Sequence, residues 1–124
     1  MIIVDNNILV TEQNENEIQL PGGGIDKGEH YIQALVRETY EETGWKIQPL
    51  KRLGFFHRFV YMPEYSKWAQ KVCHIHLCKG LYNLISPLEK GHKAILMKPE
   101  DAVNLLESPG DRFFVRTYFG LNLI

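Results

Sequence analysis

Three glutamates, Glu38, Glu41 and Glu42, are separated by three and four residues, which places them on one face of any helix that contains them. Like charges at these spacings destabilise a helix by about 0.2–0.5 kcal/mol per pair, so local stability does not explain them. Carboxylate oxygens are the ligands that Mg²⁺ prefers, usually together with the phosphates of a substrate. The cluster therefore indicates either a solvated helix face, which charge alone favours, or a divalent-cation site.

A glycine-rich turn precedes this helix and favours the cation site. Gly22, Gly23 and Gly24 follow Pro21, and such a backbone can bend sharply or lie very close to a metal or a phosphate. Glu29 stands just ahead of the helix, where a carboxylate is favoured by the helix dipole and is expected to cap the helix.

The spacing of seven residues in this segment matches the Nudix box, and the chain resembles the Nudix hydrolase family of MutT-like enzymes. The seven positions are Gly23, Glu29, Arg37, Glu38, Glu41, Glu42 and Gly44. A motif with this many fixed positions is far more specific than a lone glycine pattern. Thr39 occupies a position that is usually apolar, and Trp45 is a bulky residue at another. His30 replaces the usual Ser or Thr, which predicts a weaker helix cap.

The resemblance implies a fold, a cofactor and roles for these residues. The fold is α+β, an α/β/α sandwich with a mixed sheet, in which residues 23–45 form a loop-helix-loop. The cofactor is Mg²⁺, with Mn²⁺ as a substitute, and the expected ligands are Glu38, Glu41, Glu42 and the carbonyl of Gly22. Arg37 would orient the acidic cluster, with Glu29 in a supporting role, and one turn along the helix Arg37 can pair with Glu41. Metal-activated water would then attack phosphorus and cleave a diphosphate linkage.

The general base is left open by the motif. In the family it is either a glutamate of the box or a residue of a loop nearer the C-terminus. Glu89 and His92 occupy such a loop, and each is a candidate base or additional ligand. The alternative for both is an ordinary solvent-exposed loop residue.

Hydrophobic periodicity predicts one domain over residues 1–124, with strands and helices in mixed order. Strands are expected at 2–4, 8–11, 50–61, 72–81 and 94–97, with a helix from Tyr31 to Gly44, another beginning at Pro99 and a third at 112–118. Cys73 and Cys78 are five positions apart in one expected strand, so they should lie on opposite faces as free thiols.

Substrate specificity lies outside the box, and an aromatic segment is the candidate for it. Arg58, Tyr61, Tyr65 and Trp68 are the predicted substrate-binding residues, through base stacking and phosphate contacts. A second interpretation, favoured for Phe55, Phe56 and Phe59, is that the aromatics fill the core. Tyr61 lies sixteen residues after Trp45, an offset that resembles family members acting on dinucleoside polyphosphates.

Composition constrains the partners. The formal net charge is −1, so no general excess of Lys and Arg indicates nucleic acid, and a 5′-phosphorylated RNA end is the exception left open beside small nucleotides. The chain has no apolar run that would cross a membrane and no signal peptide, so a cytoplasmic location is expected.

The C-terminal aromatics Phe113, Phe114, Tyr118 and Phe119 either pack on the core or contribute to a homodimer.

Three functions compete. The leading one is a metal-dependent hydrolase acting on a nucleoside diphosphate-X compound. An isomerase of the same fold is disfavoured because its additional catalytic cysteine and glutamate have no counterpart in this sequence. A catalytically silent nucleotide-binding module is disfavoured because such modules usually lose carboxylates of the box, and this chain keeps them all.

Overall fold

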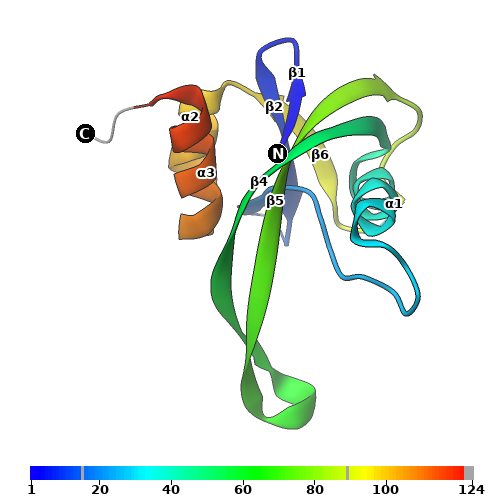
Figure 1. Cartoon of the computed structure of the whole chain (residues 1–124), viewed down its shortest axis with the longest axis vertical. Coiled ribbons are helices and arrows are strands. Elements are labelled where there is room, and N and C mark those ends of the chain that lie inside the picture. Colours follow the sequence, from blue (N-terminus) through cyan, green and yellow to red (C-terminus); the bar gives the residue numbers. More distant parts are fainter. Residues whose placement is uncertain (15, 89, 122–124) are drawn as a thin grey trace.

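The computed structural model describes residues 1–14, 16–88 and 90–121 (Figure 1). It confirms the predicted α+β class with a mixed sheet. The strands are β1 (Ile2–Val4), β2 (Asn7–Gln13), β3 (Glu17–Gln19), β4 (Trp45–Met62), β5 (Lys67–Asn83) and β6 (Lys93–Met97). The helices are α1 (Tyr31–Thr43), the short 3-10 helix η1 (Pro63–Tyr65), α2 (Pro99–Leu105) and α3 (Pro109–Phe119). None of the helices in the described ranges is long and apolar enough to cross a membrane.

Five strands of the sheet pair in the order β3-β2-β1-β5-β4. The sixth strand, β6, lies off this path and pairs with residues 8–12 of β2. β1 and β5 are parallel, whereas β1–β2, β2–β3, β2–β6 and β4–β5 are antiparallel. A tight turn joins β1 to β2. Asp5 and Asn6 have φ of 48° and 67°, the left-handed conformation that a tight hairpin turn requires and that Asp and Asn tolerate.

Helices cover both faces of the sheet and produce the expected α/β/α sandwich (Figure 1). On one face, Ile75 and Leu77 pack in a cluster with Leu106 and with Val115 of α3. On the other face, Cys78 packs in a second cluster against which Leu35 and Val36 of α1 lie. The side chains of a strand alternate between faces, which is why neighbouring residues of β5 belong to different clusters. Both cysteines are free thiols, as predicted.

β4 and β5 form a long hairpin that extends well beyond the body of the molecule (Figure 1). They pair from Trp45–Asn83 to Met62–Lys67, so both strands are longer than their sequence patterns predicted. In the described ranges β1 pairs with β5 at Cys78 and Lys79, and the amino group of Met1 donates to the carbonyl of His76 at 2.8 Å. Residues 51–77, which form the antiparallel two-stranded structure from this point to the tip, are called the β4–β5 ribbon below.

Candidate functional site

Helix α1 is capped at both ends. His30 is the N-cap: its imidazole accepts a hydrogen bond from the backbone N–H of Ile32 (3.2 Å), and the Gln33 side chain accepts one from the backbone N–H of His30 (3.0 Å). The weak cap expected from the missing Ser or Thr is thus not found, because the imidazole and Gln33 form a capping box. Gly44 ends the helix with φ 75°, a left-handed conformation suited to glycine.

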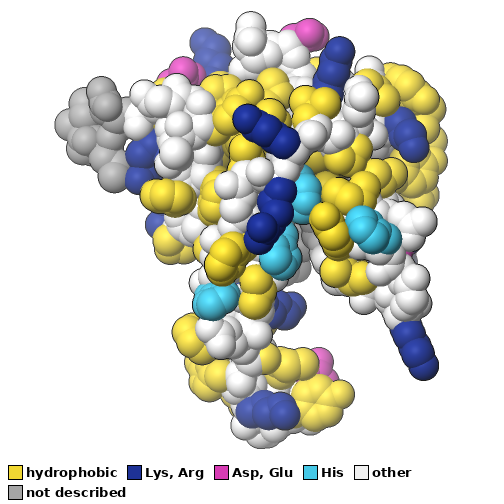
Figure 2. All heavy atoms as spheres, in the orientation of Figure 1, with side chains coloured by type: hydrophobic (Ala, Val, Ile, Leu, Met, Phe, Trp, Pro, Cys, Tyr) yellow, Lys and Arg dark blue, Asp and Glu magenta, His cyan; other side chains and the backbone are white. Residues whose placement is uncertain are grey.

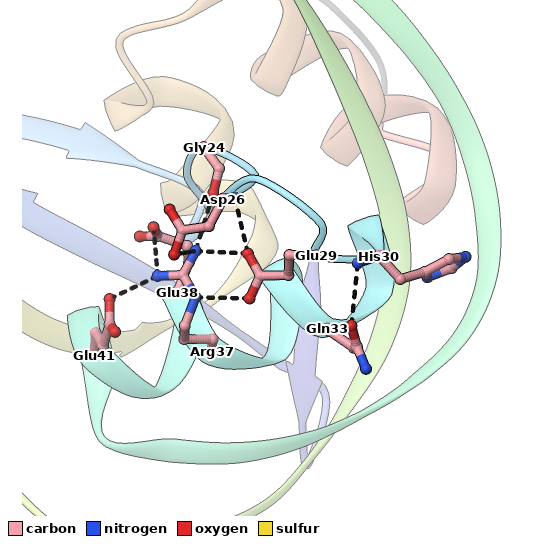
Figure 3. A network of polar contacts seen from close by, with 8 residues as sticks. All are labelled: Gly24, Asp26, Glu29, His30, Gln33, Arg37, Glu38 and Glu41. Carbon is pink, nitrogen blue, oxygen red and sulfur yellow. Dashed lines mark hydrogen bonds and ion pairs between the residues drawn. The ribbon is translucent and has the colours of Figure 1, made fainter.

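Arg37 lies at the centre of a network of carboxylates (Figure 3). Its Nε and Nη2 donate to the two oxygens of Glu29, at 2.8 and 2.9 Å. Its Nη1 donates to Oε1 of Glu38 at 3.0 Å and to Oε2 of Glu41 at 3.1 Å, which confirms the predicted Arg37–Glu41 pair. Nη2 also donates to the carbonyl of Gly24 at 3.1 Å, so a single guanidinium connects the helix to the glycine-rich loop.

Glu29 does not cap the helix, which was one of the two roles expected for it. Its carboxylate accepts hydrogen bonds from Arg37 and from the backbone N–H of Asp26 (3.0 Å), whereas His30 caps the helix. The hydrogen bond to the Arg37 side chain, with the bond from the Asp26 backbone, lowers the pKa of Glu29 from 4.5 to about 2. The same pairing raises the pKa of Arg37, so both groups stay charged over the whole physiological range.

The glycine-rich loop lies directly against the acidic face of α1. A side chain at Gly23 would overlap the Glu38 carboxylate, so only glycine fits there without displacing that group. The backbone N–H of Gly22 donates to Oε2 of Glu42 at 3.1 Å. The structure thus brings Gly22, the predicted carbonyl ligand, into the same site as the three predicted carboxylate ligands.

The donors at this site fit a hard divalent cation. Glu38, Glu41 and Glu42 supply carboxylate oxygens, and the adjacent loop supplies backbone groups, which together form the oxygen-only ligand set that Mg²⁺ prefers. In the described ranges, no three His, Cys, Asp or Glu side chains are grouped closely enough to form a complete cation site. Arg37 engages one oxygen of Glu38 and one of Glu41.

The candidate base residues precede β6 in the sequence, and Glu89 lies outside the described residues. His92 contacts β2 through its Nε2, which is 2.7 Å from the side-chain oxygen of Gln13. The role of either residue as a base stays a prediction.

A pocket of about 260 Å³ that the sequence did not indicate lies beside the first turn of α1. Its lining includes Tyr31 and Ile32 of α1, Arg52 of β4 and His76 of β5. The ring of Tyr31 lies 5.4 Å from that of His76, and burial lowers the pKa of His76, which keeps this imidazole neutral near pH 7. No local motif could reveal this pocket, because its residues come from three separate segments.

The four predicted substrate-binding residues lie on the outer part of the β4–β5 ribbon. The rings of Tyr61 and Trp68 are neighbours across the strands, 5.4 Å apart, and Tyr65 is in η1 at the tip. Arg58 and Tyr61 are three positions apart in β4, so their side chains point to opposite faces of the ribbon. The structure therefore does not bring these two side chains together.

The expectation that Phe55, Phe56 and Phe59 fill the core is wrong for two of the three. Phe55 and Phe59 are exposed, whereas Phe56 packs against Phe114 of α3, with ring centroids 6.2 Å apart. The physical reason is strand alternation: α3 covers only the face of β4 that carries Phe56. Phe113 and Tyr118 are exposed on α3, and Phe114 and Phe119 pack against the core cluster.

Comparison with known proteins places these features in context. The family model of the NUDIX domain matches residues 1–118. An RNA pyrophosphohydrolase of Pelagibacter ubique is 44% identical over 81 residues, which cover 52% of this chain and 51% of the relative. An RNA pyrophosphohydrolase of Brucella anthropi is 64% identical over 28 residues, 23% of this chain and 16% of the relative. This chain therefore matches about half, or less, of the length of these curated relatives.

A similar solved structure is a NUDIX hydrolase from Nitrosomonas europaea, with a TM-score of 0.77 at 19% identity. The alignment covers 96% of this chain and 84% of that one. At this level of identity the likeness concerns the fold, and it agrees with the sandwich described above.

Proposed function

This chain belongs to the NUDIX domain family, and we propose that its α1 site is a metal-dependent pyrophosphohydrolase site that cleaves the diphosphate linkage of a nucleoside diphosphate-X substrate. One observation carries the proposal: the carboxylates of Glu38, Glu41 and Glu42 line the face of α1 against which the glycine-rich loop lies. A diphosphate is too highly charged to enter such an acidic face alone, so a divalent cation must accompany it.

The residues of this chain would prepare the site in two ways. Arg37 engages one oxygen of Glu38 and one of Glu41, and a carboxylate keeps its second oxygen for a metal. Glu29 balances the charge of Arg37 with two parallel hydrogen bonds, so the guanidinium orients its neighbours while its own charge is compensated.

Glu42 and the loop complete the expected ligand set. The N–H of Gly22 fixes the orientation of the Glu42 carboxylate, and the carbonyl of Gly22 is the further candidate ligand. A bound Mg²⁺ or Mn²⁺ would neutralise the phosphates and lower the pKa of the attacking water. Positioning and electrostatics dominate phosphoryl chemistry, so the chain needs no covalent nucleophile.

The names of the relatives support one substrate class to test first. Two are RNA pyrophosphohydrolases, which makes a 5′-triphosphorylated RNA a leading candidate beside nucleoside triphosphates and dinucleoside polyphosphates.

The test is release of phosphate or pyrophosphate from a panel of these compounds, with Mg²⁺, with Mn²⁺ and with a chelator. Metal-dependent release from one compound far above the others is the expected result. A folded protein that binds a nucleotide but releases nothing from any compound would contradict the proposal and favour a catalytically silent binding module.

A further inference from the structure

One face of the β4–β5 ribbon presents a row of exposed aromatic side chains. Phe55, Phe59 and Tyr61 of β4 are 53, 67 and 47% exposed, and Trp68 of β5 is 68% exposed. The β4–β5 register places all four on the same face, because Phe55 pairs with His74, Phe59 with Gln70 and Tyr61 with Trp68. Large exposed apolar patches on a protein surface mark sites of interaction.

The rings of this face follow one another along the ribbon. His57 lies between Phe55 and Phe59 in the row, on the same face, and its ring is 5.8 Å from that of Phe55. The rings of Tyr61 and Trp68 are 5.4 Å apart. Exposed aromatic side chains bind single strands by stacking on their bases, with little dependence on sequence.

The charge of the ribbon matches a polyanion, although the whole chain is nearly neutral. Residues 51–77 contain five Lys and Arg residues and one acidic residue, Glu64, whereas the rest of the chain contains nine basic and fourteen acidic residues. Arg58, Lys67 and Lys71 lie on the face opposite the aromatic row, and Arg52 lies at its base. Hydrophobic, histidine and Lys or Arg side chains gather along the ribbon in Figure 2.

The aromatic face is also the face of the sheet that α1 covers. His76 lies on this face of β5 and contacts Tyr31 of α1, and Arg52 is hydrogen-bonded to His74 (3.2 Å) next to the pocket beside α1. A strand laid along the ribbon therefore leads from the tip toward the helix that carries the acidic cluster.

We propose that the aromatic face of the β4–β5 ribbon binds single-stranded RNA, with its bases stacked on Phe55, Phe59, Tyr61 and Trp68. That the 5′ end of this strand is the group processed at α1 rests on the proposed function, whereas the binding by the ribbon does not. The charge of the ribbon favours RNA over the other occupant of an exposed aromatic face, a second copy of this chain, because two such ribbons would repel each other.

The test measures binding of a short single-stranded RNA with a 5′-hydroxyl end by fluorescence anisotropy, in a chelator. This probe has no diphosphate to cleave, so the result does not depend on hydrolysis. We expect F59A and W68A each to weaken binding about tenfold, the loss typical of one stacked base. F59W should retain affinity and F59L should lose it, because stacking needs a ring. F113A is the matched control, since Phe113 is a phenylalanine of α3 with 54% exposure, and it should bind as the wild type does.

The outcomes separate this proposal from the proposed function. Loss of affinity in F59A, F59L and W68A, together with no hydrolysis of any compound by the wild type, would support RNA binding by the ribbon and contradict the proposed hydrolase activity. Equal affinity of wild type, F59A and W68A would overturn the ribbon proposal whatever the hydrolysis assay gives. Light scattering is the second readout: a wild-type dimer that F59A converts to a monomer, with RNA affinity unchanged, would assign the aromatic face to self-association instead.

Discussion

Arg37 holds the Glu29 carboxylate in a fork, with Nε to Oε2 at 2.8 Å and Nη2 to Oε1 at 2.9 Å, while its remaining nitrogen reaches Glu38 and Glu41. A planar guanidinium is the side chain that can make these contacts at once, because its donors point in fixed directions. Glu29 precedes α1 and Arg37 lies eight positions later within it, so this pair also ties the loop before the helix to the middle of the helix.

Replacing Arg37 by Lys tests the importance of this fork. Lysine keeps the positive charge, but one ammonium group cannot hold Glu29 in a bidentate pair and also reach Glu38 and Glu41. Groups that orient metal ligands typically affect metal affinity or activity by about 10–100-fold. We expect R37K to weaken Mn²⁺ binding, followed by calorimetry, and metal-dependent turnover by that range. Unchanged Mn²⁺ affinity in a folded R37K protein would show that Arg37 does not position the ligands.

The acid stability of the protein should depend on Glu29. Its pKa is about 2 in the folded protein against an ordinary value of 4.5, so pairing with Arg37 stabilises the fold above about pH 4.5. This contribution declines as the pH falls from about 4.5 toward 2, because the carboxyl is protonated first in the unfolded chain and only near pH 2 in the folded protein as well. The difference in melting temperature between wild type and E29Q should therefore be largest near neutral pH and shrink below pH 4.5. A difference independent of pH over this window would contradict the assignment.

Glu41→Gln and Glu42→Gln test the metal ligands directly. Each change removes a negative charge but keeps the shape of the side chain, so both variants should fold and lose most activity. Loss of repulsion along the helix is expected to offset part of the lost contacts to Arg37 or Gly22, so melting temperatures without metal should change little. Turnover and circular dichroism are measured together. Near wild-type activity in both variants would exclude these glutamates as essential ligands.

Gly23 and Gly24 allow a matched test of the contact between the glycine-rich loop and α1. A methyl group at Gly23 would overlap the Glu38 carboxylate, whereas one at Gly24 would meet open space. Because the Glu38 carboxylate lies at the end of a flexible side chain, G23A should shift it at little cost in stability but lower activity about tenfold or more. G24A should behave as the wild type in both assays. Equal activity of G23A and G24A would show that the close contact at Gly23 is not needed.

The helix that carries the candidate site followed directly from the sequence. The box fixes which side chains share a face, because positions three and four apart on a helix are neighbours whatever surrounds it. The start near Tyr31 and the end at Gly44 were predicted from local signals and are confirmed. The cap differs from the expectation: Glu29 was expected to cap the helix, but His30 is the N-cap and Glu29 is paired with Arg37.

The environment of each face of the β4–β5 ribbon could not be predicted from the sequence. Alternation along β4 and β5 predicted two faces, but it could not say which face a helix covers. Register shifts in the β4–β5 pairing, at Pro49/Lys51 and at Arg52/Gly54, interrupt the simple period of two nearer the body of the molecule. Phe55 and Phe59 share one face of β4 and are exposed, whereas Phe56 lies on the other face and packs on α3.

The sequence by itself determined the family, the acidic face of α1 and the glycine turn before it, because these depend on spacing within one helix and one loop. Only the tertiary structure decided that Gly22 contacts Glu42, that His76 and Arg52 form a pocket with Tyr31, and that the aromatic row faces solvent. The physical reason is range: helical periodicity acts over a few residues, whereas burial and pocket formation depend on which distant segments the sheet brings together.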